Sequence, residues 1–260
     1  MSAVAAATRA PYRTGLAAGT VDVWHIGLPG DGAGAGAVRG LPPLLDARER
    51  ARAAAMVSER DRTAFTVART ALRDILGRYL DRDPAALRFG AGRYGKPYLE
   101  DTRLAFNLSH TAGAALLALA APGPVGVDIE RITAADRTAM AERWFAPAEA
   151  AAVRAGAGRA GAPSPFWAYW TCKESYVKAL GLGLTHPLDR FEVRFAEATA
   201  DAAVFRGGRR HDGWRVRRLD LPAGYAGAVT VRGPLTRLRT WSWTPGAATA
   251  TRPEGISHHG

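Results

Sequence analysis

Residues 166–184, FWAYWTCKESYVKALGLGL, form the stretch that most constrains the fold of this chain. Aromatic side chains open it, a Lys-Glu pair lies in its middle and two glycines end it, which is typical of a helix with a glycine stop. At about 100° per residue, Trp167, Thr171, Glu174 and Lys178 fall on one narrow stripe. A bulky face adjoins this stripe and consists of Phe166, Tyr169, Trp170, Lys173, Val177 and Leu180.

The spacing of Glu174 and Lys178 allows two interpretations. A carboxylate and an ammonium four residues apart can form a surface pair that stabilises the helix by roughly 0.2–0.5 kcal/mol. The same groups, beside a face bulky enough to be held in a core, could be half of a phosphate-handling site. The helix alone favours the surface pair.

Length and composition limit the class of protein. The 260 residues suit one large domain or two small ones. The single cysteine, Cys172, excludes an internal disulfide framework and a cysteine-based zinc site, and fits a reducing compartment. Apolar runs stay shorter than the roughly 18 residues that span a bilayer, and residues 1–19 lack the pattern of a signal peptide. We therefore expect a cytoplasmic protein with no membrane partner.

The formal net charge of +11 predicts acidic partners such as nucleic acid, a phosphorylated cofactor or an acidic protein. Zinc-finger spacing, an aromatic RNA-binding strand and a dense basic tract are all missing from the sequence. We therefore expect no nucleic-acid partner, although a basic binding module stays open as an alternative.

Two halves of the chain have similar patterns. Each has a long helix, then an Arg-Phe strand (LRFGAG and LDRFEVRF), then strands built on Ala-Gly-Ala (HTAGAALLALAAPG and LPAGYAGAVTVRGP). This repetition predicts an α+β (α/β) fold with a pseudo-twofold duplication of two similar helix-plus-antiparallel-sheet subdomains. We expect subdomains at 21–124 and 125–244, a flexible arm at 1–20 and a disordered tail at 245–260. A simple alternation of helix and strand remains the other interpretation.

Individual elements follow from periodicity and from turn residues. Helices are predicted at 41–56 and 58–79, near Arg137 and from Pro147. Strands are predicted at 21–28, 87–89, 103–108, 114–121, 125–129, 191–195, 214–219 and 226–231.

Two carboxylates end one of these strands. Asp128 and Glu130 are two residues apart and so project from the same face. Side by side they repel one another unless a cation lies between them. This pattern suits Mg²⁺, but two solvated acids at an exposed strand end are an equally good interpretation of these residues alone.

Two further groups could bind phosphate. Ser109 and His110 close a strand, but adjacent strand residues point to opposite faces, which disfavours a nucleophile-base pair. Lys96 lies on a turn stiffened by Gly95 and Pro97, without the glycine-rich run of a Walker loop. A structural Ser-His pair and a solvated turn lysine are the plain alternatives.

In combination the motifs are specific. The order GRYGKPYL, FNLSHT, VGVDIERI, WFAPAE and WTCKESYVKALGLGL resembles that of the Sfp-type 4′-phosphopantetheinyl transferases over residues 45–232. The elements G-V-D-I-E and W-x-x-K-E-S-x-x-K are the most diagnostic. The resemblance implies two similar α/β subdomains with an active site in the cleft between them.

The resemblance also implies a metal and a catalytic set. Asp128, Glu130 and Glu174 would hold Mg²⁺, which also binds the pyrophosphate of coenzyme A. Lys178 would contact that pyrophosphate. Glu174 would accept a proton from the attacking serine, so that Glu174, Asp128 and Lys178 form the catalytic set.

A wider set of residues would bind coenzyme A itself. Lys96, Ser109 and His110 would bind its 3′-phosphoadenosine end, and Lys173 would support the cofactor or the carboxylates. Basic residues of the first half would contribute as well, with three candidates in Arg52, Arg69 and Arg73. Pro147 and Glu149 match a helix start whose role we expect to be structural.

The implied reaction transfers 4′-phosphopantetheine from coenzyme A to a serine of an acyl or peptidyl carrier protein and releases adenosine 3′,5′-bisphosphate. The basic surplus would steer the acidic carrier into place, and we expect a monomer. A Ser-His hydrolase using Ser109 and a nucleic-acid-binding module are the alternatives.

Overall fold

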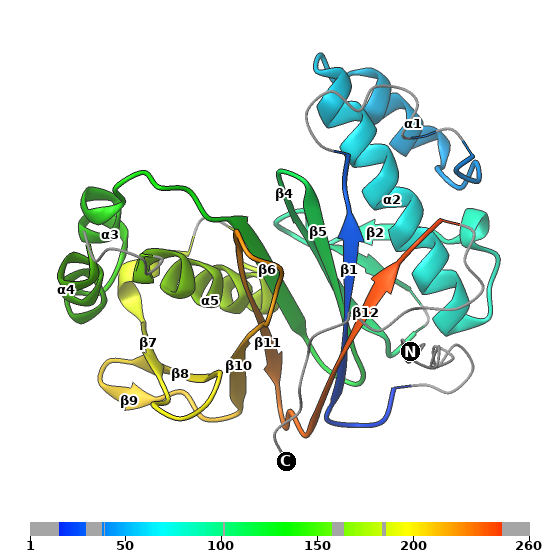
Figure 1. Ribbon diagram of the computed structural model, residues 1–260. Helices are drawn as coiled ribbons and strands as arrows, with labels where there is room; N and C mark the ends of the chain where they lie inside the picture. The colour runs from blue at the N-terminus through cyan, green and yellow to red at the C-terminus, as the bar shows by residue number, and fades with distance from the viewer. Residues whose placement is uncertain are drawn as a thin grey trace, which may run out of the picture.

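The structure is a computed structural model that describes residues 16–29, 38, 40–100, 102–157, 164–183 and 186–245. The predicted arm and tail therefore lie almost entirely outside the described residues. Two sheets with their helices lie side by side (Figure 1). Within the described ranges, no helix is both long and apolar enough to cross a membrane.

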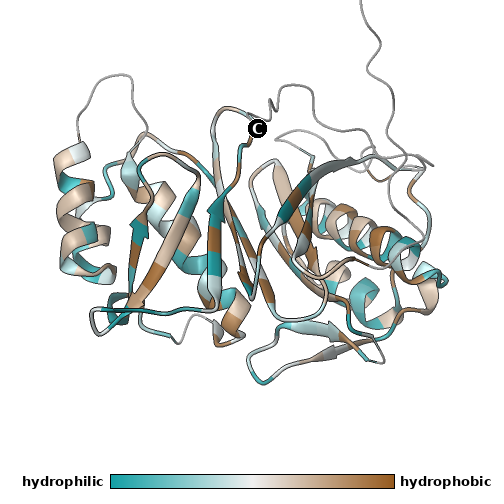
Figure 2. Cartoon of the chain, turned by 90° about the horizontal axis from the view of Figure 1, so that it is seen from below, coloured by the Kyte–Doolittle hydropathy of each residue, from teal (hydrophilic) through white to brown (hydrophobic). Residues whose placement is uncertain are grey.

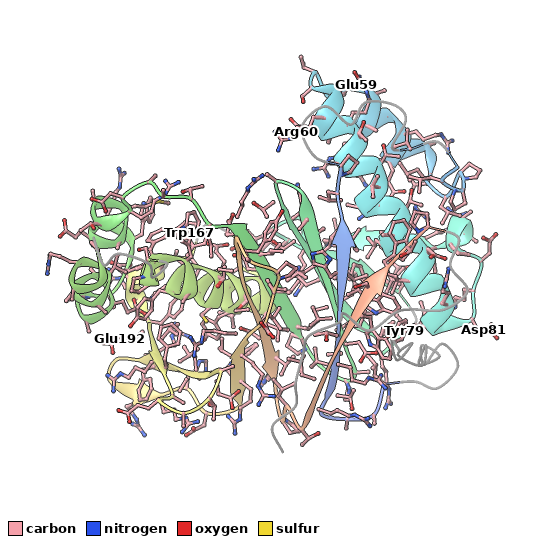
Figure 3. The ribbon with its side chains drawn as sticks, in the orientation of Figure 1. Glu59, Arg60, Tyr79, Asp81, Trp167 and Glu192 are labelled. Carbon is pink, nitrogen blue, oxygen red and sulfur yellow. The ribbon has the colours of Figure 1, made fainter. Side chains whose placement is uncertain are left out.

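The first part of the chain supplies a long helix and a set of strands. In order these are β1 (Thr20–Gly27), α1 (Ala47–Ala54), α2 (Glu59–Leu80), η2 (Pro84–Ala86), β2 (Phe89–Ala91), β3 (Pro97–Leu99), β4 (Ala105–Thr111) and β5 (Ala114–Ala120). Helix α2 begins where the Ser58 hydroxyl accepts a hydrogen bond from the amide of Asp61, and ends at Asp81 in the left-handed conformation. Figure 3 marks both ends of this helix with the labels Glu59 and Asp81.

Among the described residues, the second part of the chain supplies three α-helices, a short 3-10 helix and further strands. In order these are β6 (Val125–Arg131), α3 (Thr138–Trp144), α4 (Pro147–Gly156), α5 (Pro165–Leu180), η4 (Leu188–Arg190), β7 (Glu192–Phe195), β8 (Asp201–Arg206), β9 (Arg209–Arg210), β10 (Trp214–Arg218), β11 (Tyr225–Arg232) and β12 (Arg237–Trp243). The predicted glycine stop of α5 is confirmed, because Gly181 caps the helix with φ 71°.

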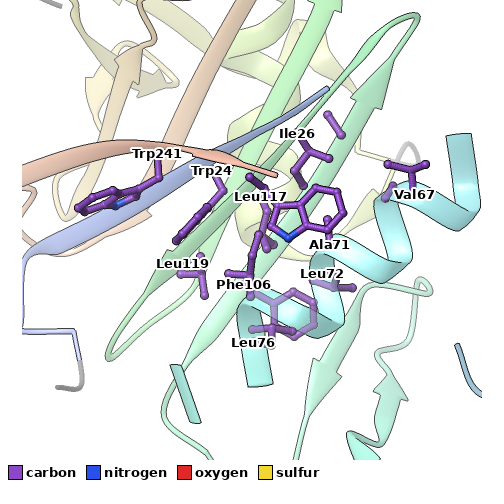
Figure 4. Close-up of a cluster of buried hydrophobic side chains, with 14 of the residues drawn as sticks. Trp24, Ile26, Val67, Ala71, Leu72, Leu76, Phe106, Leu117, Leu119 and Trp241 are labelled. Atoms are coloured by element: carbon purple, nitrogen blue, oxygen red, sulfur yellow. The ribbon is translucent and has the colours of Figure 1, made fainter. Parts of the chain in front are cut away.

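The first sheet has the strand order β12-β1-β5-β4, and β2 and β3 form a separate hairpin. Helix α2 packs on one face of this sheet through Val67, Leu72, Leu76 and their neighbours. Figure 4 shows these side chains interleaved with Trp24, Leu117 and Phe106 from the strands. Burial of this apolar stripe, at about 25 cal/mol per Å², stabilises the layer.

Strand β12 corrects two expectations. It pairs with β1 in parallel, so the first sheet is mixed and not antiparallel throughout. It also lies in the first sheet, although residues 237–243 were expected in the second subdomain. Arg239 holds this strand through an ion pair with buried Asp22 at 2.5 Å. Strands β3, β8, β9 and β12 were missed from the sequence. Helix α1 begins at Ala47, later than predicted, after an Asp46 cap.

The second sheet has the order β6-β11-β10-β8-β7, with β9 paired to β8, and its pairs are antiparallel. Helix α5 covers its inner face: Val177 and Tyr176 pack against Val193, Val204 and Val216. Figure 2 shows hydrophobic and hydrophilic residues in turn along several strands, as expected when a strand has two different faces, whereas β5 is buried along its whole length.

The two sheets share an apolar core. Val21 and Val23 of β1 and the inner residues of β5 pack against Val125, Val127 and Ile129 of β6. Strand β6 is an edge strand of its own sheet, and β4 lies next to that edge. The Asn107 side chain of β4 accepts a hydrogen bond from the amide of Val127 at 2.8 Å. A side chain thus satisfies a backbone amide that a neighbouring strand would otherwise bind.

Candidate active site

The site lies where β6 runs beneath α5. Because side chains alternate along a strand, Val125, Val127 and Ile129 face the core between the sheets, while Gly126, Asp128 and Glu130 face the other way. A Cβ atom on Gly126 would lie 2.0 Å from the carbonyl oxygen of Ser175. This glycine therefore lets the helix backbone lie directly on the strand, which brings the α5 stripe next to the carboxylates.

Asp128 is the centre of a buried polar cluster. Its Oδ1 atom accepts hydrogen bonds from the Ser109 hydroxyl at 2.9 Å and from the Lys178 ammonium at 2.5 Å. The ammonium also donates to Ser109 Oγ at 2.9 Å. Asp128 is 2 % exposed. Residues from β4, β6 and α5 thus meet at one point.

Glu130 lies at the rim of this cluster. Its carboxylate accepts hydrogen bonds from Trp170 Nε1 at 3.3 Å and from the Thr111 hydroxyl at 3.4 Å. Burial, together with the neighbouring charge of Asp128, raises the pKa of the Glu130 carboxyl.

Glu174 is the third carboxylate and is 6 % exposed. Burial raises the pKa of its carboxyl to about 7, with further upward contributions from Asp128 and Glu130 that outweigh the opposing charge of Lys178. A carboxyl with a pKa near neutrality can exchange a proton with a substrate at physiological pH.

The cluster has the chemistry of a cation site. Three carboxylates face one ammonium, and Asp128 Oδ2 is buried with no hydrogen-bond partner among the described residues. Hard oxygen donors with excess negative charge are what Mg²⁺ prefers. As the side chains stand, however, no three His, Cys, Asp or Glu residues of the described ranges already form a metal cage. Binding would therefore require the carboxylates to close in.

The rest of the α5 stripe belongs to the core. Thr171 is buried and its hydroxyl donates to the carbonyl of Trp167 at 2.9 Å. The Trp167 ring packs among Phe145 and Phe166 and lies 5.3 Å from the Arg137 guanidinium carbon. Figure 3 shows Trp167 near the start of α5.

Ser109 and His110 point to opposite faces of β4, as predicted. Ser109 is 6 % exposed, whereas His110 is solvent-exposed. Desolvation of its inner side lowers the pKa of His110, and the positive charges of Lys178 and Arg52 lower it further. A Ser-His hydrolase is therefore not supported, since the Ser109 hydroxyl contacts Asp128 and Lys178 instead. Arg52 and Lys178 are thus both near enough to His110 for their charges to act on its imidazole.

Lys96 lies behind the cluster. Its ammonium donates to the carbonyl oxygens of Val125 and Lys178, each at 2.7 Å. Burial lowers the pKa of this lysine to about 8. Two of its three donors are thus directed at the backbone of the protein.

Two of the three predicted basic residues are held in internal ion pairs. Arg73 is fully buried and binds Glu49 and Asp46 at 2.6 Å each, as well as the carbonyl of Leu87 at 2.9 Å. Arg69 donates through Nε to Glu49 at 2.6 Å. The structure therefore does not bring Arg69 and Arg73 to the carboxylate cluster as free cations, and Arg52 is the better candidate.

Lys173 lies on the opposite side of α5 from the cluster. Its buried ammonium contacts Glu149 at 2.7 Å and donates to the carbonyls of Leu188 and Phe191 at 2.8 and 2.7 Å. All three donors are therefore in use, and the structure does not bring Lys173 into the site. The structural role expected for Glu149 agrees with its 2 % exposure and with the hydrogen bond that its carboxylate accepts from the amide of Ala146.

Several contributors were missed from the sequence. Thr111 and Trp170 bind Glu130, Asn107 binds the β6 edge, and Gly126 sets the approach of the helix. All four residues lie within the motifs read from the sequence. Their contacts depend on which strand lies beside which helix, and no local pattern carries that information.

Comparison with known proteins gives the family. The family model described as the 4′-phosphopantetheinyl transferase superfamily matches residues 124–230, which include Asp128, Glu130, Glu174 and Lys178. The 4′-phosphopantetheinyl transferase ffp of Bacillus subtilis is 30% identical over 63% of this chain and 71% of its own length. The chain belongs to the Sfp-type 4′-phosphopantetheinyl transferase family.

Other relatives of this transferase family agree. The 4′-phosphopantetheinyl transferase HetI of Nostoc sp. is 36% identical over 59% of this chain and 66% of its own length. The 4′-phosphopantetheinyl transferase Sfp of Bacillus subtilis strain 168 is 34% identical over 47% of this chain and 54% of its own length. The chain thus spans just under two thirds of the length of HetI and about half that of Sfp.

Proposed function

We propose that this protein transfers the 4′-phosphopantetheine group of coenzyme A to a serine of an acyl or peptidyl carrier protein and releases adenosine 3′,5′-bisphosphate. The observation that carries the proposal is the contact of Lys178 and Ser109 with Asp128, next to Glu130 and Glu174. A buried set of anions beside a lysine suits a substrate that brings both a cation and a pyrophosphate.

Asp128, Glu130 and Glu174 would hold a divalent cation, which we propose to be Mg²⁺. When bound, this ion would neutralise charge on the pyrophosphate of coenzyme A. The uncompensated Oδ2 atom of Asp128 supports this assignment, as does the excess of carboxylates over ammonium groups.

The chain's own residues would perform the remaining steps. Lys178 would bind a pyrophosphate oxygen and stabilise the charge that develops on the departing adenosine 3′,5′-bisphosphate. Glu174 would take the proton of the carrier serine while the serine oxygen forms the new P–O bond. The P–O bond to the nucleotide breaks in the same displacement, and the bond electrons leave with adenosine 3′,5′-bisphosphate. Ser109, which contacts both Lys178 and Asp128, would keep these two side chains in position.

Coenzyme A would extend from Lys178 toward His110 and Arg52. The charges of Lys178 and Arg52 both act on the His110 imidazole, and we propose that His110 and Arg52 bind the 3′-phosphate end of coenzyme A. The formal charge of +11 favours association with an acidic carrier domain.

We propose that a monomer is the active form. Ser109 from the first sheet and Asp128 from the second meet within one chain, so the site needs no second copy. A pseudo-twofold duplication, in which each half is a sheet covered by one long helix, is our proposal for the origin of this arrangement. A reducing, cytoplasmic location suits the free, buried Cys172.

The proposal is tested by incubating the protein with coenzyme A, Mg²⁺ and an apo carrier domain and measuring the intact mass of the carrier. We expect one phosphopantetheine arm per carrier, and loss of transfer on chelation of the metal. Asp128→Ala should abolish transfer. Absence of the added arm on each of several carriers would overturn the proposal.

A further inference from the structure

Lys96 lies on the turn between β2 and β3, in the first half of the molecule. Its side chain crosses to the second half and reaches the start of β6 and the end of α5 through Val125 and Lys178. The turn that holds it is closed by hydrogen bonds from the Gly92 amide to the Lys96 carbonyl and from the Gly95 amide to the Gly92 carbonyl, both at 2.9 Å. The base of the side chain is therefore fixed.

The two carbonyls that Lys96 binds lie where each can accept a further donor. Val125 lies on the free edge of β6, because that strand has a sheet neighbour on one side only. The Lys178 carbonyl belongs to the last turn of α5, where it accepts a hydrogen bond from the Gly181 amide at 3.2 Å and the helix dipole is negative. An ammonium at this point links both carbonyls and opposes the partial negative charge.

These contacts lie directly behind the candidate active site. Lys178 carries the ammonium that contacts Asp128, and Asp128 is three residues after Val125 on β6. A shift of the last helical turn would move Lys178 away from Asp128. A displacement of about 1 Å in such an arrangement can lower a rate by about a hundredfold.

We infer that Lys96 is a positioning residue that clamps the last turn of α5 to the first residue of β6 and so holds Lys178 against Asp128. This inference rests on the proposed function for its kinetic consequences. It differs from the role that the family resemblance implies, in which the Lys96 ammonium contacts the cofactor. The half-buried ammonium and its depressed pKa agree with a group enclosed by the protein.

The two roles predict different results for Lys96→Met, which keeps the length of the side chain and removes its donors. A positioning role predicts that kcat falls by about tenfold or more, while the Kd of adenosine 3′,5′-bisphosphate changes by less than about twofold. A cofactor-contact role predicts the reverse: the Kd rises by about tenfold and kcat at saturating coenzyme A is kept. The second pattern would overturn the inference.

Hydrogen exchange supplies a readout that does not need transfer activity. The amides of Gly181 and Leu182 donate to carbonyls of the last α5 turn. In Lys96→Met we expect them to exchange about tenfold faster or more, with exchange in α2 unchanged. Unchanged exchange at both amides would overturn the inference. If the wild-type protein transfers nothing, the proposed function fails while exchange still decides the role of Lys96.

A matched control lies in the same turn. Arg93 is exposed, its guanidinium carbon lies 5.5 Å from the Tyr94 ring, and it lies in the same turn as Lys96. Arg93→Met should match the wild type in kcat, Kd and exchange. Lys96→Gln, which keeps a shorter donor, is the second variant if Lys96→Met does not fold. It should show a smaller fall in kcat and a smaller rise in exchange, with the Kd again nearly unchanged. Wild-type behaviour of a folded Lys96→Gln would count against the clamp.

Discussion

The ammonium of Lys178 lies 2.5 Å from Oδ1 of Asp128, on a different element, and this pairing decides the character of the site. The helix sequence alone favoured a surface pair between Lys178 and Glu174. Because Lys178 instead contacts the strand, Glu174 is left as a buried carboxyl among other carboxylates. This explains why the pKa of Glu174 rises to about 7 in spite of a lysine one turn away.

The stability of the protein without divalent cations should therefore depend on Glu174. The pKa of its carboxyl rises from 4.5 to about 7 on folding, so the folded state holds the proton more tightly. Its contribution is fully present below pH 4.5 and is lost as the pH rises through about 7. Asp128 and Glu130 cause part of this loss, and Lys178 opposes it.

Glu174→Gln removes this pH-dependent loss. In the presence of a chelator, we expect the variant to exceed the wild type at pH 8 by on the order of 2 kcal/mol, with a smaller gain at pH 5. Urea unfolding at the two pH values measures the difference. Glu197→Gln, on an exposed loop, is the control and should change neither value. A Glu174→Gln variant that is less stable than the wild type at pH 8 contradicts this account.

Gly126 should tolerate no side chain. A Cβ atom there would lie 2.0 Å from the Ser175 carbonyl oxygen and 2.3 Å from the amide nitrogen of Ala179, both on the helix backbone. Gly126→Ala should therefore lower the free energy of unfolding by about 3 kcal/mol, or push α5 away from β6 and abolish transfer. Thermal unfolding and the transfer assay measure the two effects.

Gly27 is the matched control for that substitution. It also lies in a strand, and a Cβ atom there would meet nothing within 4 Å. Gly27→Ala should be close to neutral in both assays. Equal behaviour of the two alanine variants would show that α5 does not lie on β6 as closely as the structure has it.

Lys173 should be important for stability and unimportant for cofactor affinity. Its ammonium and the Glu149 carboxylate form a fully buried pair, so Lys173→Met leaves a buried carboxylate without its cation and with backbone amides as its donors. We expect a loss of about 3–5 kcal/mol, of which much is recovered when Glu149→Gln is added. The Kd of adenosine 3′,5′-bisphosphate in folded Lys173→Met should match that of the wild type. A large rise in that Kd would restore the cofactor role for Lys173.

Local patterns in the sequence predicted much of this fold. Helical spacing identified α2 and α5, the glycine stop identified the end of α5, and strand alternation put Asp128 and Glu130 on one face. These features depend on neighbours within a few residues. The parallel pairing of β12 with β1 was missed because it joins residues more than 200 positions apart, such as Asp22 and Arg239.

In the candidate site, too, local patterns predicted some features and missed those that depend on long-range contacts. The motif series predicted a site of the carboxylates, Ser109 and Lys178, and the structure brings these residues close together. It did not separate free cations from paired ones: Lys173, Arg69 and Arg73 look like cofactor ligands in the sequence, and each is held by Glu149 or Glu49. Which cation has a carboxylate partner depends on tertiary contacts that composition and spacing do not contain.

The most direct test of the central claim is the rate of pantetheine transfer by Glu174→Gln, read from the intact mass of a carrier domain in the presence of coenzyme A and Mg²⁺. We predict that the wild type and Glu197→Gln add one arm at equal rates, while Glu174→Gln, folded as judged by circular dichroism, is slower by about a hundredfold or more. A Glu174→Gln variant that transfers at the wild-type rate would show that Glu174 is neither base nor cation ligand, and would contradict the account.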